Sequence, residues 1–258
     1  MAGQRVVVTG AGHGIGRALA TRMAAEGCRV LVNDLDTAAA EQVAGEIGAE
    51  VLGGDAASEE GVGKLVHAAR ELWGGVDVWF ANAGIERGRG LAASEDDWAA
   101  SFEVNTLAHV RAARLLVPEW LERASGRFVV TASAAGLLTM LGSPAYSASK
   151  HAAVAFAEWL SATYRHRGVV VQAICPQGVE TRMVAESGPL REVLAHDGIV
   201  SPEHVADVVW EAMQDDRFLI LPHPQVAKYY AARASDTDRW LSGMNKVQQG
   251  VEAHDERN

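Results

Sequence analysis

Short apolar runs alternate with helix-forming segments along most of the chain, and this alternation constrains the fold more than any other feature. The runs are rich in valine and lack polar alternation, which is typical of strands buried on both faces of a parallel sheet. We expect strands at Arg5–Thr9, Arg29–Asn33, Glu50–Gly53, Val76–Ala81, Arg127–Ala132, Val169–Cys175 and Phe218–Leu221. The sequence therefore predicts a doubly wound α/β fold of about seven parallel strands with helices on both faces.

Helices are expected between and after these strands, at Ile15–Glu26, Thr37–Ile47, Ser58–Trp73, Asp96–Arg123, Ala145–Arg167, Ser201–Gln214 and Val226–Val247. Pro118 lies inside the longest of them, where it either bends the helix or ends it. The last eight residues are polar and are expected to be frayed. Because no linker or repeat interrupts the pattern, we expect a single domain over residues 1–258.

The charge balance excludes several classes of partner. The 33 acidic and 23 basic residues give a formal net charge of −10, which argues against binding to nucleic acid or to an anionic membrane surface. No apolar run reaches the roughly 18 residues of a transmembrane helix, and the Val6–Val8 run is too short for a signal peptide. The two cysteines, Cys28 and Cys175, exclude a disulfide framework and favour the reducing cytoplasm. The nine histidines show no metal-binding spacing, so no metal site is predicted.

A glycine-rich loop follows the first strand and opens directly into a helix. It reads Thr9-Gly10-Ala11-Gly12-His13-Gly14-Ile15-Gly16. Glycines let the backbone turn sharply and approach a pyrophosphate, whose charge is stabilised at a helix N-terminus. The alternative is a loop whose glycines serve only a tight turn. The position between strand and helix favours dinucleotide binding.

An aspartate ends the second expected strand. Asp34 follows Gly16 by 34 − 16 = 18 residues, close to the spacing of about 20 at which an acid binds the ribose hydroxyls of a dinucleotide. A carboxylate there would repel a 2′-phosphate, and the next residue is Leu35 rather than an arginine. The alternative is a surface aspartate in a turn. We expect NAD as the cofactor, with NADP disfavoured.

A serine, a tyrosine and a lysine form the strongest chemical signal. Tyr146 and Lys150 are four residues apart, so both lie on one face of the expected helix. A nearby ammonium should lower the pKa of the phenol, which could then exchange a proton with a carbinol oxygen. Ser133 ends the fifth strand, where its hydroxyl could hold the same oxygen. A tyrosine and lysine at this spacing also occur by chance, so their weight comes from coinciding with the serine and the glycine loop.

Together these residues resemble the short-chain dehydrogenase/reductase family over about Arg5 to Leu221. The N-A-G motif after the fourth strand matches Asn82-Ala83-Gly84, and the segment after the sixth matches Pro176 to Thr181. The resemblance implies a Rossmann-like fold and an NAD-dependent oxidoreductase that interconverts a secondary alcohol and a ketone. It implies that the cofactor contacts Gly10, Gly12, His13, Gly14, Ile15, Gly16, Asp34, Leu35, Asp55, Ala56, Asn82, Ala83, Gly84, Tyr146, Lys150, Pro176, Gly178, Val179 and Thr181.

The resemblance also assigns catalytic roles. Tyr146 is then the general acid/base, Lys150 sets its charge and holds the nicotinamide ribose, and Ser133 orients the substrate oxygen. Asn105 supports a water that relays protons to Lys150. Other classes remain open: a dinucleotide sensor without catalysis, which would be expected to lack Tyr146 or Lys150, and a lyase or epimerase on a similar fold.

The substrate region departs from the family pattern. Gln177 replaces the glycine that usually follows Pro176, which places an amide near the nicotinamide or the substrate. Ser133, Tyr146, Gln177 and Met183 are the expected substrate contacts, within a mostly apolar wall. That wall favours a hydrophobic alicyclic or aromatic small molecule. By resemblance a lid covers about residues 181–200, and a helical extension over about residues 223–247 replaces the usual C-terminus.

Two helices predict self-association. Asp96–Arg123 and Ala145–Arg167 carry apolar residues on more than one face, so each needs a partner besides the sheet. By resemblance we expect a homo-oligomer, either a dimer or a tetramer. Two minor expectations concern single residues: His151 should be solvated, and Cys175 should be a structural thiol.

Overall fold

The strands pair into one parallel sheet in the order β3-β2-β1-β4-β5-β6-β7. The structure is a computed structural model that describes residues 1–185 and 197–255. The strands are β1 (Arg5–Thr9), β2 (Arg29–Asn33), β3 (Glu50–Val51), β4 (Val78–Ala81), β5 (Gly126–Thr131), β6 (Val169–Ile174) and β7 (Leu219–Ile220). The predicted parallel sheet is therefore confirmed. The strand order reverses direction between β1 and β4, and ligands of such sheets bind at this switch point.

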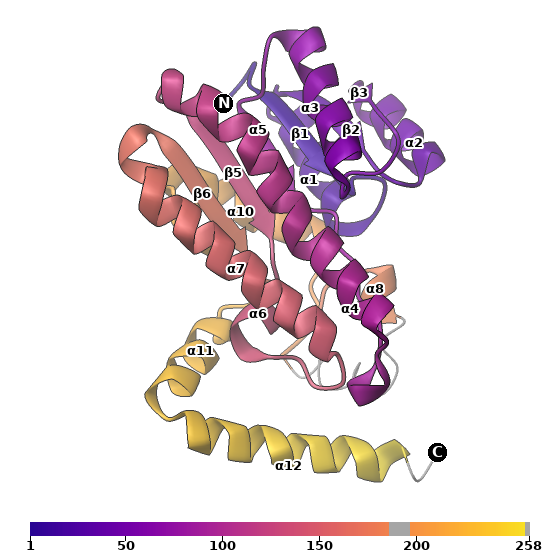
Figure 1. Cartoon of the computed structure of the whole chain (residues 1–258), viewed down its shortest axis with the longest axis vertical. Helices are drawn as coiled ribbons and strands as arrows, with labels where there is room; N and C mark the ends of the chain where they lie inside the picture. The colour runs from indigo at the N-terminus through magenta and orange to yellow at the C-terminus, as the bar shows by residue number, and fades with distance from the viewer. Residues whose placement is uncertain (186–196, 256–258) are drawn as a thin grey trace.

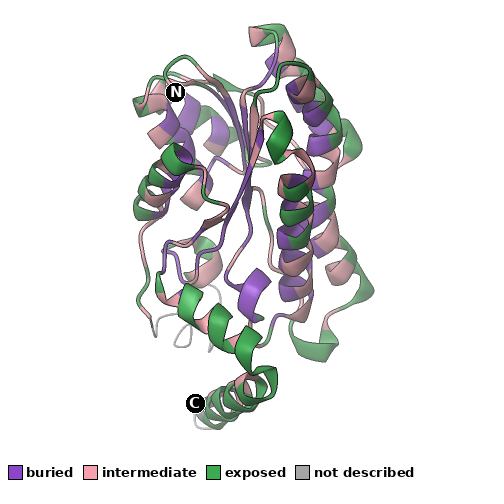
Figure 2. Cartoon of the chain, turned by 90° about the vertical axis from the view of Figure 1, so that its left-hand side faces the viewer, coloured by how far each residue is buried: buried purple, intermediate pink, exposed green. Residues whose placement is uncertain are grey.

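Two layers of helices cover the sheet (Figures 1 and 2). Neighbouring strand residues alternate between them: Val7 packs in one layer, whereas Val6 and Val8 pack in the other. This explains the unbroken apolar runs, since both faces of each strand are buried. One layer holds α3 (Glu59–Trp73), α5 (Ala108–Glu122) and α7 (Pro144–Tyr164), and the other holds α1 (Gly14–Ala25), α2 (Thr37–Ile47) and α10 (Pro202–Asp215).

The expected long helix over Asp96–Arg123 is three segments. Ser94 and Asp97 form a reciprocal capping box that starts α4 (Glu95–Phe102). A π-helical turn, η2 (Glu103–Leu107), follows, in which the Ala108 N–H donates to the Glu103 carbonyl five residues earlier. Helix α5 then continues to Glu122 with Pro118 inside it, so the proline does not end the helix.

The C-terminal region forms two helices where one was expected. Helix α11 (Gln225–Ser235) ends at Asp236, whose carboxylate accepts from the Arg239 N–H at 2.9 Å and so caps α12 (Thr237–Asp255). The prediction of a frayed end from residue 251 is wrong up to Asp255, because α12 continues to that residue. Figure 1 shows α12 standing away from the sheet. Tyr229 and Trp240 join the two helices with ring centroids 6.1 Å apart.

Short helical segments complete the described chain: η1 (Gly90–Ala92), α6 (Ala135–Leu138), η3 (Arg165–Arg167) and α8 (Arg182–Ala185). None of the helices within residues 1–185 and 197–255 has the length and apolarity needed to cross a membrane.

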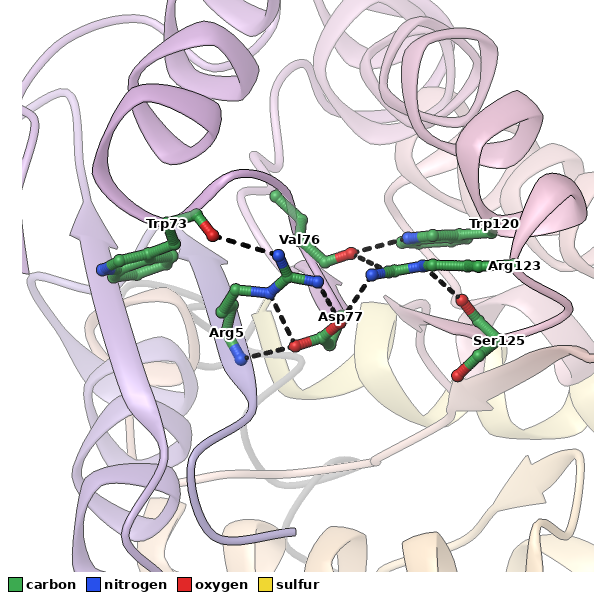
Figure 3. A network of polar contacts seen from close by, with 7 residues as sticks. All are labelled: Arg5, Trp73, Val76, Asp77, Trp120, Arg123 and Ser125. Carbon is green, nitrogen blue, oxygen red and sulfur yellow. Dashed lines mark hydrogen bonds and ion pairs between the residues drawn. The ribbon is translucent and has the colours of Figure 1, made fainter.

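An ion-pair network joins the start of β1 to the segment before β4 and to the end of α5 (Figure 3). Asp77 accepts from the Arg5 guanidinium at 2.6 and 2.9 Å, from the Arg5 backbone N–H at 3.0 Å, and from Arg123 at 2.8 Å. Arg5 also donates to the Trp73 carbonyl at 3.1 Å. Partial burial opposes ionisation of Asp77, but the hydrogen bonds and charges of the two arginines outweigh it and lower its pKa to about 2. The network lies before β4, at the end of the sheet opposite the glycine loop.

Candidate active site

The glycine loop between β1 and α1 packs too closely for side chains. A Cβ on Gly16 would lie 2.0 Å from the Gly10 carbonyl oxygen, and one on Gly10 would lie 2.9 Å from Ala83 Cα. Gly10 and Gly14 have φ values of +63° and +50°, which favour glycine. Helix α1 begins at Gly14 without a side-chain cap, so backbone N–H groups of its first turn, which includes Ile15, remain available. The loop fits a pyrophosphate group.

Asn82 fixes this loop against the middle of the sheet. Its amide nitrogen donates to the carbonyls of Thr9 and Gly10 at 3.0 and 3.1 Å, and its amide oxygen accepts from Thr131 at 2.9 Å. The Thr9 hydroxyl accepts from the N–H groups of Asn82 and Ala83, both at 3.0 Å. Thr9 opens the predicted glycine motif, whereas Thr131 was not singled out in the sequence. They show that part of the N-A-G motif holds β1, β4 and β5 together at the switch point.

Two carboxylates lie at the end of β2. Asp34 accepts from the Gly12 N–H at 2.8 Å and from the Asp36 N–H at 3.0 Å. Asp36 caps α2 and pairs with His13 at 3.4 Å. Leu35 between them is exposed. An adenosine ribose beside Asp34 would therefore meet negative charge from two side chains.

Asp55 shapes the loop before α3. Its carboxylate accepts from the N–H groups of Ala57 and Ser58 at 2.7 and 3.1 Å. Burial is the largest single effect and opposes ionisation, but these bonds and the Ser58 hydroxyl together outweigh it and lower the pKa of Asp55. The neighbouring Ala56 packs against the core. The predicted contact of Asp55 and Ala56 with the cofactor stays a prediction.

The structure brings together Ser133, Tyr146 and Lys150 at the carboxyl end of β5. Tyr146 and Lys150 are both buried, on successive turns of α7. The Ser133 hydroxyl accepts from the Ala135 N–H at 3.0 Å and lies close enough to the Tyr146 phenol to lower its pKa. Lys150 donates to the Thr131 carbonyl at 2.8 Å, and its Nζ lies 5.7 Å from the centroid of the Tyr146 ring. The hydroxyls of Ser133 and Tyr146, which could both bind one substrate oxygen, thus lie beside the Lys150 ammonium.

The pKa values of the pair differ from the expectation. Burial raises the pKa of Tyr146 to about 12, although the nearby Ser133 hydroxyl acts in the opposite direction, and burial lowers the pKa of Lys150 to about 8. The prediction that Lys150 lowers the pKa of Tyr146 is therefore wrong for the protein without cofactor. The physical reason is that both groups lose water on burial, which disfavours the charged form of each.

Asn105 lies in the π-helical turn, fully buried behind Lys150. It exchanges two hydrogen bonds of 2.9 Å with the backbone of Ile85 and donates to the Ser149 hydroxyl at 3.0 Å. A Cβ on Gly84 would lie 3.2 Å from Lys150 Nζ and 3.3 Å from Asn105 Oδ1. Gly84 therefore lets these groups approach one another. Ser149, which sequence reasoning missed, fixes the Asn105 amide.

His109 is a buried imidazole that the sequence did not reveal as part of this region. It follows Asn105 by four residues, and its Nε2 is buried without a partner. Burial, assisted by the charge of Lys150, lowers its pKa to about 3. The imidazole is therefore neutral at physiological pH.

The segment after β6 folds against the glycine loop. A Cβ on Gly14 would lie 3.0 Å from Thr181 Cγ2, and Val179 pairs with Val200 in an isolated bridge. The Pro176 carbonyl accepts from Ala134 at 2.8 Å, and the Gly178 carbonyl accepts from Val200 at 3.1 Å. These contacts bring the predicted cofactor residues of this segment to the switch point.

Gln177 connects this segment to the C-terminal helices. Its amide nitrogen donates to Asp197 at 3.3 Å, and Asp197 accepts from the Tyr229 hydroxyl at 3.0 Å. The Gln177 amide oxygen is buried without a partner. Met183, the last expected substrate contact, is half-buried in α8. Of the expected lid over residues 181–200, residues 186–196 lie outside the described residues.

His151 is partly buried and contacts Arg233 of α11, so the prediction that it is solvated is only partly right. Its Nδ1 lies 2.9 Å from the Ser147 carbonyl and its Nε2 lies 3.2 Å from Arg233. Arg233 also donates to the Leu137 carbonyl. Helix α11 therefore holds both α6 and the helix that carries Tyr146.

A polar cluster beside the first turn of α7 was also missed. Glu86 accepts from the Ser143 hydroxyl at 2.6 Å and from Arg89 at 2.9 Å, and Arg89 donates to the same hydroxyl at 3.0 Å. Gly90 donates to the Gly142 carbonyl at 2.9 Å. The loop after β4 is thus fastened to the loop that precedes the catalytic helix.

Comparison with known proteins places the chain among relatives of one kind. A family model described as short chain dehydrogenase matches residues 4–191. The chain is 40% identical over 223 residues to 1-deoxy-11-beta-hydroxypentalenate dehydrogenase of Streptomyces exfoliatus, covering 83% of this chain and 81% of that one. It is 32% identical over 221 residues to cyclohexanol dehydrogenase of an Acinetobacter species, covering 81% and 87%.

A solved structure matches over nearly the whole chain. The crystal structure of a short chain dehydrogenase/reductase from Burkholderia phymatum in complex with NAD superposes with a TM-score of 0.83 at 32% identity. The match covers 92% of this chain and 95% of that chain.

Proposed function

Because this chain belongs to the short-chain dehydrogenase family, we propose that it interconverts an alicyclic secondary alcohol and the corresponding ketone, with NAD as cofactor. The observation that carries the proposal is that Ser133, Tyr146 and Lys150 come together at the carboxyl end of β5, with Lys150 held by the Thr131 carbonyl next to Gly84. Two hydroxyls can bind one carbinol oxygen, and one of them can accept its proton.

The cofactor assignment is supported by the closely packed glycine loop and by the two carboxylates that follow β2. NAD, when bound, supplies the acceptor for the hydride. The first turn of α1 would bind its pyrophosphate, and Asp34 would accept hydrogen bonds from the adenosine ribose. The segment Pro176–Thr181 would line the nicotinamide end. The carboxylates of Asp34 and Asp36 would disfavour the 2′-phosphate of NADP.

The proposed proton transfer uses this chain's own groups. Ser133 holds the alcohol oxygen and Tyr146 removes its proton. Lys150 lies on the face of the Tyr146 ring, where its charge stabilises the phenolate once a ligand has displaced water from the site. Asn105 acts through Lys150 as a positioning residue, since its amide is fixed by Ile85 and Ser149.

An alicyclic substrate is supported by the relatives and by the apolar wall. The two curated relatives are named for a hydroxypentalenate and for cyclohexanol. The expected wall would use Leu137 and Leu138 beside Ser133, and Val179 and Met183 after β6; the first three are buried in the core of the protein. Burial of a saturated ring against such a surface contributes about 25 cal/mol per Å². A short hydroxy acid would bury far less apolar area.

The experiment is a panel of cyclic alcohols and their ketones, together with short hydroxy acids, assayed with NAD(H) and NADP(H) by the absorbance of the reduced cofactor. We expect the highest kcat/KM for a cyclic alcohol with NAD. Higher kcat/KM for a short hydroxy acid would refute the substrate class. A complete lack of cofactor reduction or oxidation would indicate a lyase, an epimerase or a non-catalytic sensor.

The proposal extends to assembly and location. The side chains of Leu107, Leu115 and Trp159 on η2, α5 and α7 are 42%, 36% and 55% exposed, and together with Trp98 and Phe102 on α4 they leave apolar surface that a second copy would cover. We therefore propose a homo-oligomer. Both cysteines, Cys28 and Cys175, are free thiols, which supports a reducing cytoplasm.

A further inference from the structure

Glu86 is a fixed and mostly enclosed carboxylate in the loop after β4. Its side chain is only 9% exposed, and its Oε1 accepts hydrogen bonds from both Ser143 and Arg89. The backbone on either side is also held, because Ile85 is bonded to Asn105 and Gly90 to Gly142. The carboxylate is therefore positioned by its surroundings rather than free to turn into solvent.

This carboxylate is hydrogen-bonded to the residue that precedes the helix of the proposed acid/base. Ser143 immediately precedes α7, and Tyr146 lies in the first turn of that helix. Apart from burial, the charge of Glu86 is among the causes that raise the pKa of Tyr146. The negative charge of Glu86 is thus close enough for the phenol oxygen to be affected by it.

One oxygen of Glu86 remains available. Within the described residues, Oε2 has no hydrogen-bond partner, yet it is not among the buried atoms that lack one. It is therefore open to water or to a ligand. A substrate whose hydroxyl binds Tyr146 would place the substituents of its reacting carbon within the field of this carboxylate.

We infer that Glu86 is a specificity-determining residue, whose carboxylate selects neutral substrates over those with a negative charge adjacent to the reacting carbon. The inference rests on the proposed function, and it narrows the substrate class to uncharged cyclic alcohols at that position.

Three other groups near the site could also affect how well an anionic substrate would bind. Arg89 offsets part of the negative charge, but its side chain is 50% exposed and therefore screened by water. Lys150 is buried with its Nζ 5.7 Å from the centroid of the Tyr146 ring, so its positive charge attracts an anion. The Cys175 thiol is buried with a pKa raised to about 12, chiefly by burial, and is neutral. Glu86 is therefore the carboxylate whose negative charge acts on Tyr146.

The test compares trans-2-hydroxycyclohexanecarboxylate with its methyl ester, which is neutral and has nearly the same shape. We expect the wild-type protein to show a higher kcat/KM for the ester, and Glu86→Gln to narrow the ratio of ester to acid by about three- to tenfold. Glutamine keeps an acceptor for Ser143, so the loop should stay in place. Glu95→Gln, which removes an exposed charge at the start of α4, is the matched control and should leave the ratio unchanged.

A second readout separates charge from structure. Because Glu86 raises the pKa of Tyr146, Glu86→Gln should move the acidic limb of the kcat/KM profile for cyclohexanol oxidation to lower pH. An unchanged ester-to-acid ratio in an active Glu86→Gln variant, or an unmoved limb, would overturn the inference while leaving the proposed function intact. If the wild-type protein oxidises no cyclic alcohol of the panel, the proposed function fails, and the inference fails with it.

Discussion

Lys150 donates its hydrogen bond to the carbonyl of Thr131 at 2.8 Å, and its Nζ lies 5.7 Å from the centroid of the Tyr146 ring. A strand carbonyl, rather than the phenol oxygen, thus holds the ammonium. Among the described residues no carboxylate pairs with Lys150. The site keeps an uncompensated buried cation beside a buried phenol, and both have pKa values shifted toward their neutral forms.

Tyr146→Phe should reduce kcat by at least about a hundredfold, because the phenol is the proposed group that exchanges the substrate proton. The affinity for NADH, measured by fluorescence titration, should stay within a few-fold, since the adenosine half is bound elsewhere. A variant that retains most of its kcat would refute the assignment.

Lys150→Met should abolish most turnover and yet stabilise the protein against unfolding. Burial lowers the pKa of Lys150 from its ordinary value of 10.5 to about 8, so the folded state disfavours its charge. The increase in the free energy of unfolding, about 1–3 kcal/mol, should be complete below pH 8 and should shrink as the pH rises from 8 to 10.5. Urea unfolding at pH 7 and pH 10 measures it. A variant that is less stable than wild type at pH 7 would show that the bond to Thr131 matters more than the buried charge.

Wild-type protein should prefer NAD over NADP by roughly ten- to a hundredfold in kcat/KM, since a 2′-phosphate would lie beside the carboxylate of Asp34. Asp34→Ala should narrow this gap, although it also removes the acceptor for the Gly12 N–H. Asp36→Asn is the comparison variant, because it removes one negative charge and keeps the hydrogen bond from the Gly12 N–H to Asp34. Equal kcat/KM for the two cofactors in the wild type would contradict the prediction.

Asp77→Asn should lower the free energy of unfolding by about 1–3 kcal/mol, because it leaves two arginines without their anion. The lowered pKa of Asp77 means that its contribution is complete above the unfolded value near 3.8 and is lost as the pH falls toward 2. The difference between variant and wild type should therefore shrink below pH 4. Urea unfolding at pH 7 and pH 3 measures it. Glu60→Gln, in an ion pair on an exposed helix surface, should change stability much less.

Light scattering at micromolar concentration should give a mass that is a multiple of 27.4 kDa. Trp159→Glu should shift the protein toward the monomer, since the indole is 55% exposed and stacks on Phe156. Leu241→Glu, at a residue of α12 that is 57% exposed, tests whether any exposed apolar residue has this effect. A wild-type mass near 27 kDa would contradict self-association through α7.

The sheet could be predicted because its signals are local. Valine runs and the glycines that end them placed the strands to within a few residues, although β4 begins at Val78 rather than Val76. The break between α11 and α12 had a local signal as well, since Asp236 is a good helix N-cap. It was missed because the apolar spacing continues across it.

The sequence predicts which residues carry the chemistry of the site. It does not predict the contacts and the burial that distant segments give them. The contact of His151 with Arg233 depends on α11, which lies about 80 residues later in the chain. The sequence of α11 has no pattern that reveals where the helix packs. The sign of the Tyr146 pKa shift depends on burial, which the spacing of Tyr146 and Lys150 does not report. Glu86 gains its position from Ser143, across a separation that no local motif spans.

The π-helical turn η2 has a consequence for how this enzyme tolerates change. Its wider turn holds one residue more than an α-helical path would, so α4 and α5 are out of phase with each other. Deleting one residue between Glu103 and Leu107 would rotate α4 by about 100° relative to α5 and would turn the Asn105 amide away from Ile85. A library of substitutions in this turn should therefore yield graded losses, whereas a library of single deletions should yield inactive protein. The number of residues in the turn, more than their identity, therefore determines whether the Asn105 amide reaches the backbone of Ile85.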